Sequence, residues 1–490
     1  MSADLILVID AGTTSTRAIA FSQDGVIVAS AARPLTQHYP ASGWVEHDAG
    51  EIWRLSRDCL IDVADQVGAS RIDAIGITNQ RETVVFWDAD TGEPLAPAIV
   101  WQDRRTAEIC AALKAAGHEP AVQAATGLLL DPYFSATKIR WGIDNWPQVA
   151  AAEAAGRLRI GTVESWLIWK LSAGARHITD ATNASRTLLM QLATCKWDPE
   201  LLALFGVPAA ILPEIVDCAG ALAVTTLLGH DIAITGSAGD QQAAAIGQAC
   251  LSPGQLKATY GTGCFLLAHA GPVAPVSHHR LLSTVAWRLN GVPAYALEGA
   301  IFTAGAAVQW LRDGLAIIAS SGETAALAQS VPDSGGVVFV PALAGMGAPH
   351  WNPAARGSLT GLSAGTTRAH IVRATLEAMG QQTADLIDAL AADGVAAASL
   401  RVDGGMVAND WLCQDLADSL GIGVKRPRVI ETTALGAAML AGVGAGIFAD
   451  LADAAKMSVP DRQFDPALAR SDRQARRDRW ARAVRQTLAD

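Results

Sequence analysis

The sequence predicts an α/β protein built as two related domains around a central cleft, and three observations support this. The chain has 490 residues, more than one hydrophobic core usually organises, which allows about two to four domains. Half of the residues are hydrophobic and 17% are charged, so a large buried interior is expected. Apolar strands alternate with helical segments, and a turn rich in glycine and threonine near the N-terminus has an echo at Tyr260 to Cys264.

The first half begins with a predicted β-meander. The continuous apolar run from Leu5 to Ile9 is typical of a central strand. The polar turn Ala11 to Ser15 leads to a second strand over Arg17 to Phe21, and a third follows over Val26 to Ala31. The next predicted elements are a helix over Glu51 to Val67 and a strand over Ile72 to Thr78.

The second half repeats this beginning. A strand over Gln255 to Thr259 leads through the turn Tyr260 to Cys264 into a strand over Phe265 to Ala268. We therefore expect an internal duplication with a boundary between Gly247 and Pro253, which gives domains at residues 1–248 and 249–490. The later predicted elements are a helix over Gly299 to Leu311, a strand over Val337 to Val340, a loop over Ala344 to Gly361, a helix over Ala369 to Leu390, a strand over Leu400 to Val402 and a helix over Asn409 to Leu420.

Composition excludes several classes of function. The net charge of −11 argues against general affinity for nucleic acid. The seven cysteines are scattered, odd in number and without a CxxC pair, which favours reduced thiols in a cytoplasmic protein. The first residues lack the positive region of a secretory signal, and the uncharged stretch Thr433 to Ala449 is too short and glycine-rich for a membrane span. We expect a buried helix there instead.

The turn after the first strand carries candidate phosphate ligands. Asp10 ends the strand, and a carboxylate in this position can hold Mg²⁺ through water molecules. Gly12 has no side chain and lets the backbone approach a phosphate group closely. The groups that could bind phosphate oxygens are those of Thr13, Thr14, Ser15 and Arg17. The alternative is an ordinary hairpin turn, and the GxxxxGK[ST] pattern of a P-loop is absent.

Asp240 is the candidate catalytic residue. It follows Gly239 and opens a predicted helix over Gln241 to Gln248. Taken alone, an aspartate at this place is more often an N-cap. The position also suits a general base at the mouth of a cleft. In phosphoryl transfer, positioning and charge neutralisation dominate, so a carboxylate that accepts the proton of the substrate hydroxyl is the expected partner.

Arg81 and Glu82 form a candidate clamp for a small polyol. They follow directly on a buried-type strand, where a polar run needs a reason. A guanidinium beside a carboxylate can bind neighbouring hydroxyls through charge-assisted hydrogen bonds, although a structural ion pair is the alternative. Trp101, Tyr133 and Phe265 could enclose the carbon side of the polyol, although each aromatic residue on its own is more often part of the core.

Four segments could bind a nucleotide, and they come from both halves of the chain. The turn Asp403 to Gly405 joins a strand to a helix, and its glycines permit a nucleotide to approach the backbone closely. The four segments are residues 12–17, residue 262, residues 305–309 and residues 404–409. This distribution favours a cleft between the domains.

Together, these motifs resemble the glycerol kinase branch of the FGGY carbohydrate kinase family, within the superfamily of sugar kinases, heat-shock proteins and actin. The similarity extends from Val8 to about Phe448. Its most specific stretches are GWVEHD (43–48), GITNQRET (76–83), IVWQDRRTAEIC (99–110), DPYFSATK (131–138), TNASRT (182–187), AGDQQAA (238–244), TYGTGCF (259–265), YALEGAIFTAGAAVQWLRD (295–313), RATLEA (373–378), RVDGGMVAND (401–410) and TALGAA (433–438). The resemblance implies two domains with ribonuclease-H-like cores that close on the cleft between them.

The resemblance also implies an activity and a site. The expected reaction is the transfer of a phosphoryl group from Mg²⁺–ATP to glycerol, the first step of glycerol catabolism, by a homo-oligomer that is a dimer or a tetramer. Asp240 would be the general base, and Asp10 would support Mg²⁺. Glycerol would be bound by Arg81, Glu82, Trp101, Tyr133, Asp240, Gln241 and Phe265. ATP would be bound through its phosphates by Thr13, Thr14, Ser15 and Arg17, and through the rest of the nucleotide by Thr262, Gly305, Gln309, Gly405 and Asn409.

Three other functions are compatible with parts of the pattern. A sister kinase could act on another polyol, such as erythritol, or on a ketose, such as xylulose, although a longer sugar needs a roomier pocket. A sensor of glycerol or nucleotide could keep the fold without catalysis, and an actin-like filament protein could share the superfamily. The segment Leu227 to Ile234 is shorter and less basic than the loop that binds fructose 1,6-bisphosphate in some bacterial family members, so we expect that regulation to be absent.

Overall fold

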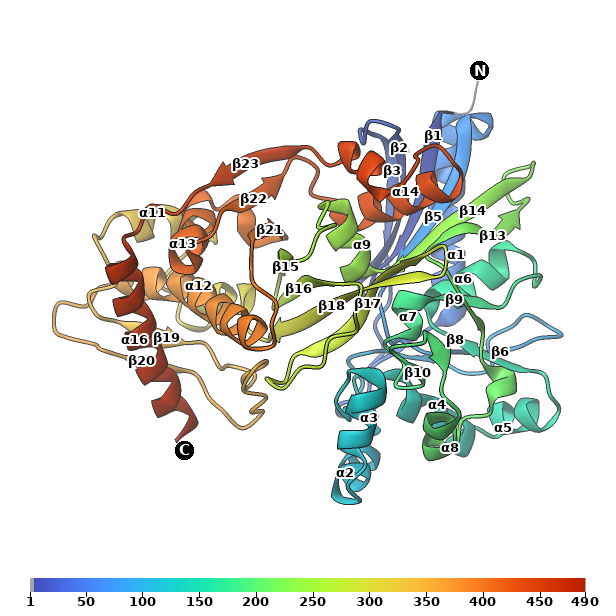
Figure 1. Cartoon of the computed structure of the whole chain (residues 1–490), viewed down its shortest axis with the longest axis horizontal. Coiled ribbons are helices and arrows are strands. Elements are labelled where there is room, and N and C mark those ends of the chain that lie inside the picture. The colour runs from blue at the N-terminus through green and yellow to red at the C-terminus, as the bar shows by residue number, and fades with distance from the viewer. Residues whose placement is uncertain (1–3, 490) are drawn as a thin grey trace.

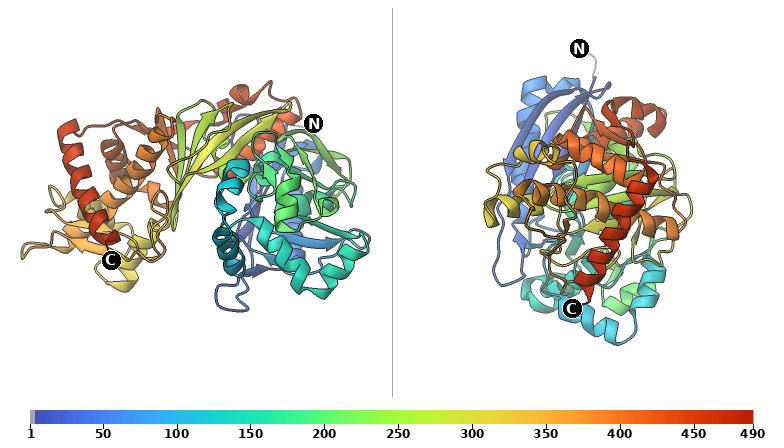
Figure 2. Two further views of the ribbon diagram at one scale, coloured as in Figure 1. Left: turned by 60° about the horizontal axis from the view of Figure 1, so that its bottom comes forward. Right: turned by 90° about the vertical axis from the view of Figure 1, so that its left-hand side faces the viewer.

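The computed structural model describes residues 4–489 and shows two lobes, each organised around a β-sheet (Figures 1 and 2). The predicted α/β class and its two related domains are confirmed. The first lobe contains a sheet of six strands. In spatial order these strands are β13 (Ala219–Thr225), β14 (Ile232–Gly239), β5 (Ile72–Asn79), β1 (Leu5–Ala11), β2 (Ser15–Ser22) and β3 (Ile27–Pro34).

The second lobe contains a sheet of seven strands. In spatial order they are β17 (Leu282–Leu289), β18 (Val292–Ile301), β16 (Cys264–Gly271), β15 (Gln255–Tyr260), β21 (Ser399–Asp403), β22 (Val424–Pro427) and β23 (Pro460–Phe464). Short two-stranded pairs complete the β-structure. They are β4 (Glu46–His47) with β7 (Ala98–Ile99), β6 (Val85–Asp88) with β8 (Leu158–Gly161), β9 (Ile178–Asp180) with β12 (Glu214–Val216), β10 (Met190–Gln191) with β11 (Lys196–Trp197), and β19 (Val338–Val340) with β20 (Ser358–Thr360).

The two large sheets share one plan. Strand β1 pairs antiparallel with β2 and parallel with β5, and β15 pairs antiparallel with β16 and parallel with β21. The correspondence continues outward, because β3 matches β18, β14 matches β22 and β13 matches β23. The internal duplication inferred from the two turns is therefore confirmed. The exact boundary near residue 248 stays a prediction.

Helices cover both sheets (Figure 1). In the first half they are α1 (Ala49–Val67), α2 (Ala107–Ala115), α3 (Glu119–Thr126), α4 (Ser135–Asn145), α5 (Pro147–Ala154), α6 (Val163–Leu171), α7 (Ala181–Ala184), α8 (Pro199–Phe205) and α9 (Asp240–Gly247). In the second half they are α10 (Gly305–Gln309), α11 (Glu323–Gln329), α12 (Arg368–Ala392), α13 (Asp410–Leu420), α14 (Thr432–Gly444), α15 (Leu451–Ala454) and α16 (Arg470–Leu488). Within residues 4–489, none of the helices is long and apolar enough to cross a membrane.

Helix α14 returns the chain from the second sheet to the first. It packs against α9, β14 and β5, and its buried residues share a core cluster with Ile6 and Val8 of β1. Helices α9 and α14 approach closely because each places a glycine against the backbone of the other. A Cβ added at Gly247 would lie 1.9 Å from the carbonyl oxygen of Thr432, and one added at Gly436 would lie 1.8 Å from that of Ala243. The stretch predicted as a buried helix is therefore one, and it ties the two halves together.

Two predicted elements differ from the structure. The helix expected over Gly299 to Leu311 begins only at Gly305, because residues 299–301 finish β18 and pair with β16. Beyond Gln309 the backbone widens into one π-helical turn, Trp310–Gly314. The loop expected over Ala344 to Gly361 contains β20, which pairs with β19. In both places strand pairing outweighs the local pattern of the sequence.

Candidate functional site

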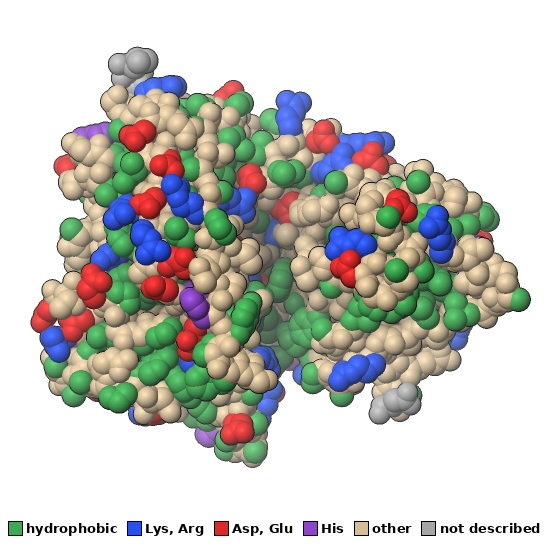
Figure 3. Space-filling model, turned by 180° about the vertical axis from the view of Figure 1, so that it is seen from behind, with side chains coloured by type: hydrophobic (Ala, Val, Ile, Leu, Met, Phe, Trp, Pro, Cys, Tyr) green, Lys and Arg blue, Asp and Glu red, His purple; other side chains and the backbone are tan. Residues whose placement is uncertain are grey.

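The candidate residues lie at two main places, the edge of the first sheet and a cavity in the second lobe. A hollow separates the two lobes when the molecule is seen from behind (Figure 3). The first sheet contributes the carboxyl ends of β1, β5 and β14, which pair in parallel and so end at one edge. Asp10, Arg81 and Asp240 lie at these three ends. Candidate residues from distant parts of the chain are thus brought to one edge of the sheet.

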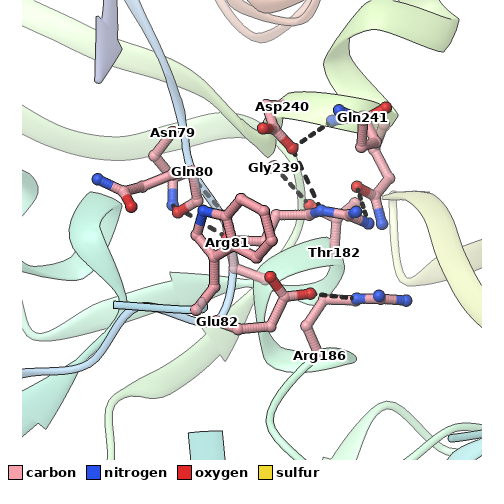
Figure 4. A network of polar contacts seen from close by, with 12 residues as sticks. Asn79, Gln80, Arg81, Glu82, Thr182, Arg186, Gly239, Asp240 and Gln241 are labelled. Carbon is pink, nitrogen blue, oxygen red and sulfur yellow. Dashed lines mark hydrogen bonds and ion pairs between the residues drawn. The ribbon is translucent and has the colours of Figure 1, made fainter. Parts of the chain in front are cut away.

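Arg81 lies at the centre of a network of charges (Figure 4). Its Nε is 3.2 Å from Oδ1 of Asp240, and its Nη1 donates a hydrogen bond of 2.6 Å to Oε2 of Glu298. Only 2% of the Arg81 side chain is exposed. Desolvation alone would lower the pKa of Arg81, but Glu298 and the other nearby anions outweigh it and raise that pKa, so Arg81 stays a cation. Arg81 therefore has Asp240 and Glu298 as its ion-pair partners.

Glu82 is held from the other side of the network. Arg186, which follows α7, donates from Nε to Oε1 of Glu82 at 2.7 Å and from Nη2 to Oε1 of Glu298 at 2.8 Å. The backbone of Glu82 has a φ of 61°, an uncommon left-handed conformation for this residue type. The hydroxyl of Ser135 donates to the Glu82 carbonyl at 2.9 Å and fixes this turn. Arg81 and Glu82 therefore form ion pairs with other residues rather than with each other.

The pKa values of the Glu82 and Glu298 carboxylates shift in opposite directions. Burial raises the pKa of Glu82, with Arg81 and Arg186 opposing the shift. For Glu298, burial would also raise the pKa, but Arg186 and Arg81 outweigh it and the pKa is lowered. Glu298 faces two guanidinium groups at hydrogen-bonding distance, whereas Glu82 has one. The carboxylate that the sequence analysis did not assign is the more firmly ionised of the two.

Asp240 is not the N-cap of α9. The N-cap is Gly239, and Asp240 is the first helical residue, with its Oδ1 accepting from the backbone N–H of Gln241 at 2.7 Å. Its side chain is 33% exposed, so it is open to the cleft although Arg81 contacts it. The turn before it is fixed from below, because the N–H of Gly239 donates to the hydroxyl of Thr182 at 2.9 Å (Figure 4). The Asp240 carboxylate is thus fixed at the start of α9 and remains accessible to solvent.

The aromatic residues cluster beside this network. The ring centroids of Trp101 and Tyr133 are 5.6 Å apart, and those of Trp101 and Phe265 are 6.5 Å apart, both in edge-to-face geometry. The indole N–H of Trp101 donates to the hydroxyl of Thr13 at 2.9 Å. This bond links the aromatic wall to the turn that follows β1. Phe265 comes from the second sheet, so the wall spans both lobes.

The first turn holds a buried carboxylate and a cation. Burial raises the pKa of Asp10 to about 6, while Arg17 opposes the shift from a distance of 3.5 Å. Arg17 also donates from Nη1 to Oε2 of Glu431 at 2.5 Å, just before α14. The turn itself is closed by the N–H of Gly12, which donates to the carbonyl of Ser15 at 3.0 Å. Thr14 at its tip is exposed.

A cavity of about 570 Å³ lies in the second lobe. Five residues singled out from the sequence line it: Thr262, Gly305, Gln309, Gly405 and Asn409. They come from the β15–β16 turn, α10, and the segment between β21 and α13. Asn409 caps α13 by accepting from the N–H of Leu412 at 3.2 Å, and it donates to the hydroxyl of Thr324 at 3.2 Å. Arg312, Ser321 and Thr324 also line this cavity, and no sequence motif had singled them out.

Gln241, expected to bind glycerol, connects the first lobe to the second. Its side-chain oxygen accepts a hydrogen bond of 2.6 Å from Nζ of Lys257, a buried residue of β15. No role was assigned to Arg186 or Glu298 from the sequence, although both lie in stretches that resemble the family, TNASRT (182–187) and YALEGAIFTAGAAVQWLRD (295–313). Only the pairing of distant segments shows their proximity to Arg81.

Comparisons with known proteins identify the family of the chain and its overall fold. The family model described as "FGGY family of carbohydrate kinases, N-terminal domain" matches residues 5–247, and its C-terminal counterpart matches residues 256–445. The chain is 55% identical over 492 residues to a glycerol kinase of Rhodospirillum rubrum, covering 99% of each chain. A structure of Plasmodium falciparum glycerol kinase with ADP superposes with a TM-score of 0.95 at 37% identity, covering 99% of each chain. A xylulose kinase of Rhodospirillum rubrum superposes with a TM-score of 0.89 at 26% identity, covering 99% of each chain.

Proposed function

The chain belongs to the FGGY family of carbohydrate kinases, and we infer that it transfers the γ-phosphoryl group of ATP to a terminal hydroxyl of glycerol. The observation that carries this inference is the site that joins Arg81, Glu82 and the open carboxylate of Asp240 beneath the Trp101–Tyr133 wall. A polyol needs charged hydrogen-bonding partners on its hydroxyls and apolar surface against its carbons. The 55% identity to a named glycerol kinase, against 26% to a xylulose kinase, favours glycerol among the substrates of the family.

The chemistry assigned to Asp240 is that of a general base. Its exposed carboxylate accepts the proton of the terminal hydroxyl as the oxygen attacks the γ-phosphorus atom. The bond between phosphorus and the β–γ bridging oxygen breaks, and ADP leaves with that oxygen. Arg81, beside Asp240, and Glu82 orient the hydroxyls so that the attacking oxygen stays in line. The protein supplies position and charge, which account for most of the catalysis in phosphoryl transfer.

The ATP phosphates are assigned to the turn after β1, and the rest of the nucleotide to the cavity of about 570 Å³ in the second lobe. Burial raises the pKa of Asp10 to about 6, and a cation beside this carboxylate would stabilise its ionised form. Asp10 is therefore suited to hold Mg²⁺. When bound, Mg²⁺ would neutralise charge on the phosphates. Arg17, now paired with Asp10 and Glu431, would turn to the phosphate oxygens.

A substrate profile tests the assignment. We expect ADP release from Mg²⁺–ATP with glycerol, and a rate below about one-tenth of it with xylulose, ribulose or erythritol, because the larger sugars do not fit the aromatic wall. The measurement is coupled ADP release at equal acceptor concentrations, with a reaction lacking acceptor as the control. Preferential turnover of a longer sugar would make the chain a sister kinase, and turnover with none of them would favour a sensor.

A variant that fills the cavity tests the nucleotide assignment. A Cβ at Gly405 has no neighbour within 4 Å, so Gly405→Leu should fold normally. We expect it to raise the KM for ATP at least about tenfold and leave the KM for glycerol unchanged, since the added side chain occupies space assigned to the nucleotide. Gly365→Leu is the matched control, because that glycine is exposed, outside the cavity, and has its nearest atom at 3.9 Å. An unchanged KM for ATP in Gly405→Leu would contradict the assignment of the nucleotide to this cavity.

The location and assembly of the protein are part of the proposal. All seven cysteines lie within the described residues and are free and buried, which suits a reducing cytoplasm. A homo-oligomer, as a dimer or a tetramer, stays a prediction from the family resemblance.

A further inference from the structure

Glu298 links the second sheet to the two residues of the polyol clamp. It lies in β18 of the second lobe, yet its two carboxylate oxygens accept hydrogen bonds from Arg81 at 2.6 Å and Arg186 at 2.8 Å, both from the first half of the chain. The exposed fractions of these side chains are 2% or less. Since Arg186 also holds Glu82, the charges alternate in sign from Asp240 through Arg81, Glu298 and Arg186 to Glu82.

Stability alone does not explain this buried network, because buried ion pairs contribute little to the net free energy of folding. Removing ions from water carries a large free-energy cost, and the attraction between them often only offsets that cost. Replacement of such networks by apolar side chains is frequently neutral or stabilising. The network instead fixes the orientation of the Arg81 and Glu82 side chains. Glu298 occupies the Nη1 edge of Arg81 and leaves its Nε facing Asp240, while Arg186 fixes one oxygen of Glu82.

We propose that Glu298 is a positioning residue for glycerol binding, which orients Arg81 directly and Glu82 through Arg186. The inference rests on the proposed function and goes beyond it, because Glu298 acts through other residues and contributes from the opposite lobe. The geometry of the polyol site then depends on where β18 lies relative to the first sheet. The ion pairs support the role, since Glu298 is the one carboxylate of this network that contacts both guanidinium groups.

Two substitutions separate position from charge. Glu298→Asp keeps the charge but shortens the side chain by one methylene, so it cannot keep both contacts of 2.6 and 2.8 Å. Glu298→Gln keeps the length but removes the charge, and it leaves Asp240 as the one ion-pair partner of Arg81 and Glu82 as that of Arg186. In both variants Arg81 would turn toward Asp240 and away from the glycerol hydroxyls. We expect both to raise the KM for glycerol at least about tenfold, the loss expected for charged hydrogen bonds that are misplaced.

The experiment measures kcat, both KM values and the melting temperature of the full chain. A positioning role predicts a raised KM for glycerol with the KM for ATP within about twofold of wild type, because the cavity in the second lobe does not include Glu298. Asp415→Asn is the control. It also removes a buried carboxylate that accepts from an arginine, Arg476 at 2.8 Å, but it should lower the melting temperature without changing the KM for glycerol.

The outcomes are distinct. A Glu298→Asp variant with a KM for glycerol within about twofold of wild type would overturn the positioning role. Failure of both Glu298 variants to fold would also overturn it, because the residue would then be an element of folding. If the wild-type chain itself released no ADP in the presence of glycerol, the proposed function would fail before the inference was reached.

Discussion

Asp240→Asn is expected to lower kcat by at least about 10²-fold while glycerol binding stays largely intact, which is the usual effect of losing a general base. The amide keeps the volume of the side chain and an oxygen that can accept from the N–H of Gln241. It cannot accept the proton of the attacking hydroxyl. Since the side chain is 33% exposed, we expect the melting temperature to change little when the contact with Arg81 is weakened.

The measurement is steady-state ADP release together with glycerol binding by calorimetry. Asp198→Asn is the matched control, because Asp198 is a true N-cap and accepts from the N–H groups of Glu200 and Leu201 at the head of α8. Asparagine caps nearly as well as aspartate, so this control should keep wild-type kcat. A kcat for Asp240→Asn within tenfold of wild type would assign Asp240 to helix structure or substrate binding rather than to proton transfer.

The sheets could be predicted from the sequence because their signals are local. The apolar run Leu5 to Ile9 and the turns beside it need no distant information, and the repeated turn at Tyr260 to Cys264 predicted the duplication that the pairing of β15 confirms. The helix predicted from Gly299 failed for the opposite reason. Its first residues complete a strand only because β16 lies beside them, and that pairing is not visible in the local pattern.

The site divides in the same way. The family motifs identified Arg81, Glu82 and Asp240, and the structure brings Arg81 into contact with Asp240. The partners of these residues were missed because they are distant in the sequence. Arg186 and Glu298 are separated by 112 residues and come from different lobes. Both lie in stretches that resemble the family, but the resemblance assigned them no role, and only the fold shows that they share one buried environment.

Arg81→Ala is expected to lower kcat/KM for glycerol by about 10- to 150-fold, which corresponds to about 1.5–3 kcal/mol for lost hydrogen bonds to a charged group. Most of the change should be in KM, because Arg81 binds the substrate hydroxyls before and during the reaction. The structure adds a second effect. Truncation leaves Glu298 with Arg186 as its remaining partner and releases Asp240, so the free energy of unfolding should fall by up to about 3–5 kcal/mol.

A second arginine separates these two effects. Arg288 is also largely buried and forms an ion pair of 2.5 Å with Asp217, but its partners lie outside the polyol site. Arg288→Ala should destabilise the protein and leave the KM for glycerol unchanged. Titration with urea and steady-state kinetics on both variants would therefore distinguish binding from folding. If Arg81→Ala lost stability but kept its KM for glycerol, Arg81 would be only the counterion that Glu298 requires, and the polyol site would have to lie elsewhere in the cleft.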